Sequence, residues 1–276
     1  MQGVNPLAKN RTVRAVDVLT PRSLDEAIAL KAEQPEAWPI QGGTDVMVAL
    51  NFDHGRPPAL LNLNEVPELR GWSRENGSLR LGSGLTYMEI ERGELREILP
   101  ALAEASRTVG SPQIRNRGTI GGNLGTASPA GDALPPLLVE AAEVECTSVR
   151  GVRRLALGEF VTGVKRTALA PDELITAVWL VPSRAPQTFM KIGPRNAMVI
   201  AVVSLAVSAG DELRASFGSA APRPVLVTAA RDDASTFAER VAEAAAPIDD
   251  VRGTAAYRRH ALRVLTERAL ERTLAA

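Results

Sequence analysis

The stretch GTIGGNLGTASPAGD, residues 118–132, is the most informative part of this sequence. It is rich in glycine and contains no aromatic side chain. Glycine has no Cβ and tolerates positive φ, so a stretch of this kind lets a ligand or another backbone segment come very close. The rest of the sequence has to show which ligand that is.

A second glycine loop, IQGGTDV (residues 40–46), follows a short strand predicted at Trp38–Ile40. Both loops place a Gly-Gly pair beside a threonine. Successive N–H groups in such loops can converge on an anion, and the hydroxyls of Thr44 and Thr119 can add donors. Two such loops could hold a pyrophosphate from two sides, as glycine-rich loops hold dinucleotides. Two tight turns that serve packing alone are the alternative, and the pattern by itself leaves both open.

The remaining pattern predicts an α+β fold. Up to residue 165, strands and helices follow one another, and two helices begin with capping-box spacing, at Ser23–Glu26 and Thr86–Glu89. The strands are predicted at 12–18, 38–40, 60–64 and 78–83; the longest helix is predicted at 86–110, and a helix followed by a strand after Asp132. From about residue 167, ELITAVWLVP, QTFMKIG, MVIAVVSLAVSAG and ELRASFGSA alternate like an antiparallel meander, and two helices close the chain. We therefore expect a domain boundary near residue 165.

Composition excludes several classes of function. Lys+Arg and Asp+Glu both number 32, so there is no basic surplus for nucleic acid. One cysteine and two histidines argue against a disulfide, a cysteine-ligated metal, a zinc site or a histidine triad. No P-loop motif is present. No apolar run has the length of a signal peptide or a membrane span, so we expect a cytoplasmic protein without a membrane partner. No catalytic residue and no metal ligand is predicted.

Three charged residues around the second loop have alternative roles. Asp132 can cap the helix that follows it, or it can accept a hydrogen bond from a ligand hydroxyl. Arg115 and Arg117 flank the loop and can pair with a ligand or with local carboxylates.

At this point the residues carry a family likeness. QGGTDV (41–46) and SPQIRNRGTIGGNLGTASPAGD (111–132) closely resemble the two flavin-binding segments of the FAD-binding (medium) subunits of the molybdenum hydroxylases, the xanthine dehydrogenase and aerobic carbon monoxide dehydrogenase type. FMKIGPR, FGSAAPRPV and DVRGTAAYRRHALRVLTERAL look like the C-terminal domain of that family. The likeness covers nearly the whole chain from about residue 12.

The resemblance implies an α+β architecture in two parts. A tail at 1–11 would precede an FAD-binding domain at 12–165, built of two α/β subdomains (about 12–55 and 56–165) of the PCMH/vanillyl-alcohol-oxidase-like kind. A smaller domain at 166–276, with an antiparallel sheet and helices, would cover the flavin end.

The resemblance also implies a non-covalent FAD site. Backbone amides of two segments would surround the pyrophosphate: Gln41, Gly42, Gly43, Thr44, Asp45 and Val46 in the first, and Thr119, Ile120, Gly121, Gly122 and Asn123 in the second. Asp132 would contact the ribityl or ribose region. Lys191 would approach the isoalloxazine, where a cation could stabilise a reduced anionic flavin.

The function implied is that of an electron-transfer subunit. A 2Fe–2S small subunit would supply electrons, a large subunit would carry the molybdopterin–molybdenum centre, and NAD or another acceptor would receive the electrons, as in a xanthine dehydrogenase-like heterotrimer. Relatives often have an aspartate or tyrosine near the flavin ring, whereas this chain has Met198-Val199 there, so NAD does not follow from the sequence. A stand-alone FAD-dependent oxidoreductase and a nucleotide-binding module without redox activity are the alternatives.

Overall fold

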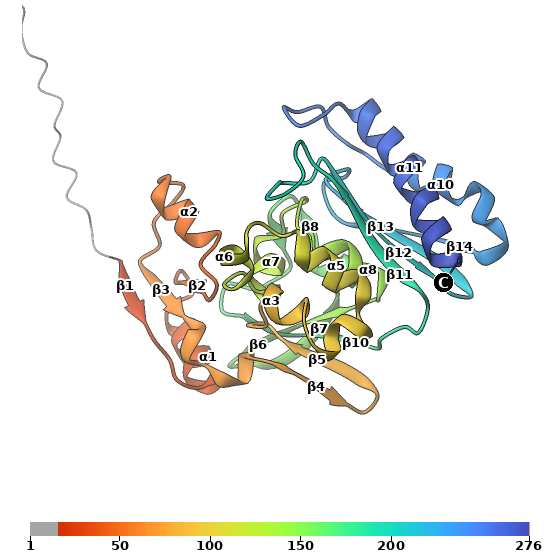
Figure 1. Ribbon diagram of the computed structural model, residues 1–276. Helices are drawn as coiled ribbons and strands as arrows, with labels where there is room; N and C mark the ends of the chain where they lie inside the picture. The colour runs from red at the N-terminus through yellow and green to blue at the C-terminus, as the bar shows by residue number, and fades with distance from the viewer. Residues whose placement is uncertain (1–15, 276) are drawn as a thin grey trace, which may run out of the picture.

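The computed structural model describes residues 16–275, which form three larger sheets, one two-stranded sheet and covering helices. In Figure 1 the N-terminal sheet lies on the left, the central sheet in the middle and the C-terminal sheet with its two helices on the right. The predicted tail at 1–11 and most of the strand predicted at 12–18 lie outside the described residues. None of the helices between residues 16 and 275 has the length and hydropathy needed to cross a membrane.

The N-terminal part is a small parallel sheet in the order β1-β3-β2. Its elements are β1 (Asp17–Leu19), α1 (Leu24–Glu33), β2 (Trp38–Ile40), α2 (Val46–Asn51) and β3 (Ala59–Asn62). The Ser23 hydroxyl accepts a hydrogen bond from the Glu26 amide and caps α1, as its spacing predicts. Because β3 pairs with β1 and β2, this pairing favours a subdomain division after β3; the division at residue 55 stays a prediction.

The central sheet is antiparallel, in the order β4-β5-β10-β6-β7. Its strands are β4 (Trp72–Glu75), β5 (Ser78–Gly82), β6 (Glu143–Ser148), β7 (Gly151–Ala156) and β10 (Leu174–Leu180). The expectation that ELITAVWLVP opens the C-terminal meander is wrong, since β10 pairs with β5 and β6 instead. All seven residues of β10 are buried, which is the burial of a central strand covered on both faces. The domain boundary at 165 remains a prediction, and this pairing favours a division after β10.

The helix predicted at 86–110 is three short helices, α3 (Tyr87–Ile90), α4 (Glu94–Ile98) and α5 (Pro100–Thr108). Gly93 has φ 62°, which no helix interior contains, and Pro100 opens α5 because it cannot continue a preceding helix. The capping box at Thr86–Glu89 is confirmed. The other elements here are α6 (Pro112–Arg115), α7 (Ile120–Thr126), α8 (Leu134–Val139), α9 (Leu157–Phe160), β8 (Val161–Gly163) and β9 (Arg166–Thr167).

The C-terminal sheet is a meander, β11-β12-β13-β14, as the alternation of its residues predicts. Its elements are β11 (Gln187–Ile192), β12 (Val203–Ala209), β13 (Glu212–Gly218), β14 (Val225–Ala230), α10 (Ala234–Glu243) and α11 (Ala255–Leu274). The helices α10 and α11 cover one face (Figure 1). The other face packs on α5 and α8 of the central part, where Phe189 and Ala206 meet Ala101, Ala105 and Val139.

Candidate functional site

The two glycine loops, far apart in the sequence, pack directly against each other. A Cβ at Gly42 would lie 2.2 Å from the Arg117 carbonyl oxygen, so only glycine lets the two backbones approach this closely. The Arg117 guanidinium donates to the Gln41 carbonyl at 3.0 Å and ties the loops together from the side. The sequence pattern leaves the relation of the loops open, and the structure places them side by side.

The first loop has free backbone donors. The amides of Gly42, Gly43 and Thr44 donate to no other residue within the described part of the chain. Gly43 has φ +76°, which turns the chain into α2. Buried or half-buried N–H groups without protein partners are rare, so this loop is suited to bind the acceptor atoms of a ligand.

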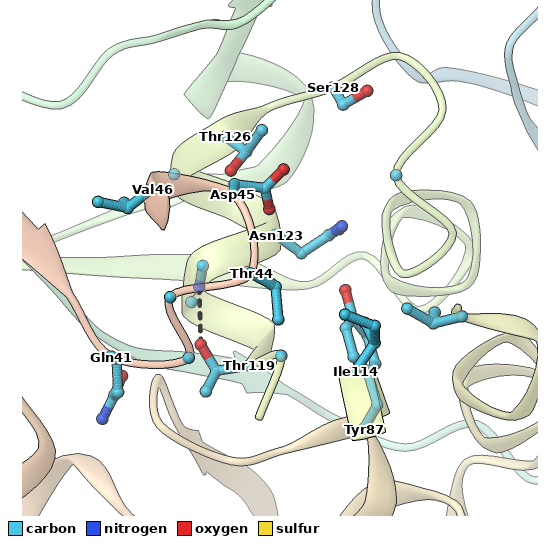
Figure 2. Close-up of a pocket in the computed structure, with 18 of the residues that line it drawn as sticks. Gln41, Thr44, Asp45, Val46, Tyr87, Ile114, Thr119, Asn123, Thr126 and Ser128 are labelled. Atoms are coloured by element: carbon cyan, nitrogen blue, oxygen red, sulfur yellow. Dashed lines mark hydrogen bonds between the residues drawn. The ribbon is translucent and has the colours of Figure 1, made fainter. Parts of the chain in front are cut away.

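The second loop differs, because its amides from Ile120 to Asn123 already have partners in the protein. The Ile120 amide donates to the Leu85 carbonyl (2.9 Å), and the Gly121 amide donates to the Ser83 carbonyl (2.8 Å). The Gly122 amide donates to the Thr119 hydroxyl at 3.0 Å, the dashed contact in Figure 2.

The second loop also packs against the protein core and against Ser83. A Cβ at Gly121 would lie 2.6 Å from the Ser83 Cβ, and the Ile120 side chain is fully buried in the core. A Cβ at Gly122 would meet only the Thr119 hydroxyl, so Gly122 faces open space. The second loop therefore offers a surface for close approach rather than a second set of free amides.

Both loops line one cavity of about 600 Å³. Figure 2 shows the Gln41–Val46 segment lying alongside α7 across this space. This volume lies within the usual range for ligand and cofactor pockets, about 300–1,000 Å³. Eleven of the thirteen residues predicted for the site line the cavity: Gln41, Gly42, Gly43, Thr44, Asp45, Val46, Thr119, Gly121, Gly122, Asn123 and Asp132. Ile120 and Lys191 do not line it.

Asp132 is held in the cavity wall by an ion pair with Lys191. The Lys191 Nζ lies 2.5 Å from the Asp132 Oδ2, and each side chain is only 6% exposed. Lys191 also donates to the Thr108 carbonyl at 3.3 Å. Burial raises the pKa of Asp132, and the neighbouring ammonium opposes that shift. Lys191 thus links β11 of the C-terminal sheet to the cavity wall.

One carboxylate oxygen of Asp132 accepts no hydrogen bond from the described residues. The residue that caps α8 is Ala133, so the capping role considered for Asp132 is not used. Its Oδ2 accepts from Lys191, while its Oδ1 is buried without a hydrogen-bond partner among residues 16–275. Ser83 Oγ and Asn123 Oδ1, which belong to two other cavity-lining residues, are also buried and unpartnered. Unpaired buried polar atoms are costly, so this wall is suited to a ligand with hydroxyl or N–H groups.

The arginines beside the second loop do not line the cavity. Arg115 forms an ion pair with Glu91 (3.1 Å), with both side chains largely buried, and so uses the local-carboxylate alternative. Arg117 donates to the first loop. Both guanidinium groups are therefore engaged by groups of the protein.

Sequence reasoning missed several residues that line the cavity. Tyr87 is brought there by the bridge between Thr86 and Thr119, a contact with no local sequence signal. Met198 and Val199, by contrast, are the pair that the family resemblance places beside the flavin ring, and they line the cavity with Ile200 from the loop between β11 and β12. Met198 has φ 52°, and Met198 and Ile200 are more than half exposed. This loop has neither an acid nor a phenol.

Other chemistry-bearing residues lie elsewhere. Cys146 is buried, and burial raises the pKa of its thiol to about 11, which leaves it unreactive. The His54 ring stacks on Phe52 at 6.1 Å between centroids. Across residues 16–275, no group of three or more His, Cys, Asp or Glu residues is arranged to hold a metal ion.

The chain is similar to known proteins along most of its length. Residues 14–183, more than half of the chain, match the sequence model of a family described as the FAD binding domain in molybdopterin dehydrogenase. The chain belongs to the FAD-binding subunits of the molybdenum hydroxylases. It is 32% identical to the xanthine dehydrogenase FAD-binding subunit of Escherichia coli O157:H7, over 92% of this chain and 94% of that one. It is also 32% identical to the carbon monoxide dehydrogenase medium chain of Afipia carboxidovorans, over 94% and 96% of the two chains. The crystal structure of quinoline 2-oxidoreductase from Pseudomonas putida 86 matches with a TM-score of 0.88 and 25% identity, over 95% of this chain and 98% of that one.

The cavity of this family member fits FAD by its own residues. The free amides of Gly42, Gly43 and Thr44 are complementary to pyrophosphate oxygens. The unpartnered oxygens of Asn123 and Asp132 are complementary to sugar or ribityl hydroxyls. Apolar side chains that also line the cavity, among them Trp38, Leu63, Leu169 and Ile175, suit the faces of aromatic rings.

Proposed function

We propose that this chain is the flavin relay of a xanthine dehydrogenase-like molybdenum hydroxylase. A 2Fe–2S small subunit would deliver electrons to it, a molybdenum-cofactor large subunit would oxidise the substrate, and NAD or another acceptor would take the electrons away. Membership of the FAD-binding subunit family supports the proposal. The relatives named subunit or medium chain, which match along nearly their whole length, support the multi-subunit part.

The packing of two distant glycine loops onto one cavity is the observation that carries the proposal. In the proposed site, the first loop binds the pyrophosphate through its amides, and the second loop allows the ligand to approach the backbone at Gly122. Bound FAD supplies the redox chemistry, one electron or two at a time. The protein's own contribution is position and charge: Asp132 accepts from a ligand hydroxyl, and the Lys191 ammonium stays within the wall beside it.

An exposed apolar surface on α2 supports a protein partner near the cavity. Met47 and Val48 of α2 are 45% and 51% exposed, Phe52 directly after the helix is 70% exposed, and α2 has no buried residue. This helix follows directly on the first glycine loop. Contiguous exposed apolar patches mark interaction surfaces, so these side chains are candidates for contact with a partner subunit.

The test begins with the purified chain, which should be yellow and should release FAD on denaturation. A colourless protein that takes up no FAD would exclude both the relay and a stand-alone flavin enzyme, and a nucleotide-binding module would then be favoured. Co-expression with the genes beside it should yield a complex with iron–sulfur and molybdenum subunits. A flavoprotein that remains alone and reduces its flavin with its own substrate would favour the stand-alone enzyme.

The electron acceptor can be identified with the assembled complex. After the substrate of the large subunit has bleached the flavin absorbance, NAD and artificial acceptors are added separately, and the return of the absorbance is followed. Rapid recovery with NAD identifies NAD as the acceptor. Recovery only with other oxidants would show that the acceptor is not NAD.

A further inference from the structure

Tyr87 is a buried tyrosine whose hydroxyl has no protein partner within the described residues. The side chain is 4% exposed, yet it lines the cavity. No hydrogen bond joins its hydroxyl to another residue between 16 and 275. The hydroxyl oxygen is not among the fully buried unpartnered atoms, so it opens onto the cavity, where a ligand can accept its hydrogen bond.

The position of the Tyr87 ring is fixed from three sides. Its amide donates to the Gly118 carbonyl at 3.1 Å, and the capping box of Thr86 and Glu89 fixes the start of α3. The ring lies so close to Gly118 that a Cβ there would be 3.1 Å from two ring carbons. Ile114 lies beside it, and Figure 2 shows the hydroxyl end pointing toward the space between Thr44 and Asn123. A ring held in this way needs no ordering when a ligand binds.

Charge at this position defines the role of the hydroxyl. Burial raises the pKa of Tyr87, and the carboxylates of Asp132 and Asp45 raise it further. The phenol therefore keeps its proton at every working pH and can donate a hydrogen bond. The complementary ligand group is an acceptor, and pyrophosphate oxygens are the acceptors expected between the two glycine loops.

We propose that the Tyr87 hydroxyl is a third anchor of the dinucleotide, which donates a hydrogen bond to its pyrophosphate from outside both glycine loops. The inference rests on the FAD site proposed above and adds a residue to it. A tyrosine here also supplies an aromatic ring in a chain that has only two tyrosines and 4% aromatic residues.

The two tyrosines make a matched experiment. Tyr87→Phe removes only the hydroxyl and keeps the ring packed on Gly118, whereas Tyr257→Phe makes the same change at a residue 47% exposed on α11. FAD is removed from each protein, and the dissociation constant is measured by flavin fluorescence titration; ADP affinity is measured by calorimetry. Thermal unfolding of the FAD-free proteins checks that both variants fold.

Tyr87→Phe should weaken FAD binding about ten-fold or more, because a hydrogen bond to a charged acceptor is lost. ADP binding should weaken by a similar factor, since ADP contains the pyrophosphate, and Tyr257→Phe should match the parent for both ligands. An FAD dissociation constant for Tyr87→Phe within about two-fold of the parent would overturn the inference, as would a loss seen for FAD and not for ADP. A parent protein that binds no FAD at all would instead overturn the proposed function.

Discussion

Replacing Lys191 by methionine tests whether one buried ion pair holds the C-terminal sheet against the cavity wall. The Lys191 Nζ lies 2.5 Å from the Asp132 Oδ2, and both side chains are 6% exposed. Methionine keeps most of the apolar stem and removes the charge. The Asp132 carboxylate would then stay buried without its cation.

The expected cost follows from burial. Removing one partner of a buried ion pair costs about 3–5 kcal/mol, because an uncompensated charge remains inside the protein. That is a large part of the roughly 5–15 kcal/mol that stabilises an ordinary domain. The double variant Lys191→Met with Asp132→Asn should recover much of the loss, since it leaves no buried charge behind.

The loss should depend on pH in a definite direction. Burial raises the pKa of Asp132, and the Lys191 ammonium opposes the rise. Without that ammonium, the folded-state pKa lies still further above the unfolded value of about 3.9. A carboxyl group with a raised pKa favours the folded state below its unfolded pKa, and this stability is lost as pH rises through the folded pKa. The loss of unfolding free energy caused by Lys191→Met should therefore be small near pH ~4 and largest near neutrality.

The measurement is urea unfolding of the FAD-free protein across this pH range, followed by circular dichroism. Lys165→Met is the matched control, because Lys165 is exposed and its loss should change the free energy of unfolding by less than about 0.5 kcal/mol. A Lys191→Met protein as stable as the control at neutral pH would refute the reasoning. So would a deficit that persists unchanged on acidification.

Three further variants test other parts of the structure. Gly42→Ala should lower the free energy of unfolding by about 1–3 kcal/mol in urea, because its Cβ would collide with backbone of the second loop. Gly122→Val should lose FAD, as seen by absorbance, yet keep its unfolding midpoint, because Gly122 faces the cavity. Arg258→Met should cost about 3–5 kcal/mol in thermal unfolding, since Arg258 is 1% exposed and paired with Asp250 at 2.5 Å. Hydrogen bonds from Arg252 and Arg258 hold the pKa of Asp250 well below its usual range. The contribution of the Arg258–Asp250 ion pair to the free energy of unfolding is therefore present near neutral pH and is lost as pH falls into the acid range.

The sequence predicted the cavity better than it predicted the roles of the residues in it. Glycine pairs beside threonine identify close-approach loops, and eleven of thirteen residues predicted for the site line one cavity. The assumption that both loops offer free amides was too simple. Whether an amide is free depends on distant carbonyls such as those of Ser83 and Leu85, and no local pattern shows these.

Two errors in the fold have different physical origins. The break in the helix predicted at 86–110 was visible in Gly93 and Pro100, both of which interrupt helices by local conformation. The placement of β10 was not visible, because an apolar strand carries no mark of which sheet it joins. Its partners β5 and β6 are chosen by packing across long stretches of chain.

The position of β10 has a consequence for biosynthesis. Strands β4 to β7 leave the ribosome before β10, which completes the middle of their sheet. A nascent chain that has not yet reached Leu174 therefore has two unpaired strand edges, those of β5 and β6, and such edges invite misassembly. Because Leu174 and Ile175 also line the cavity, the binding space is incomplete until β10 has been translated. The cavity wall is therefore completed only after β10 and the Met198–Ile200 segment that follows it have both been translated.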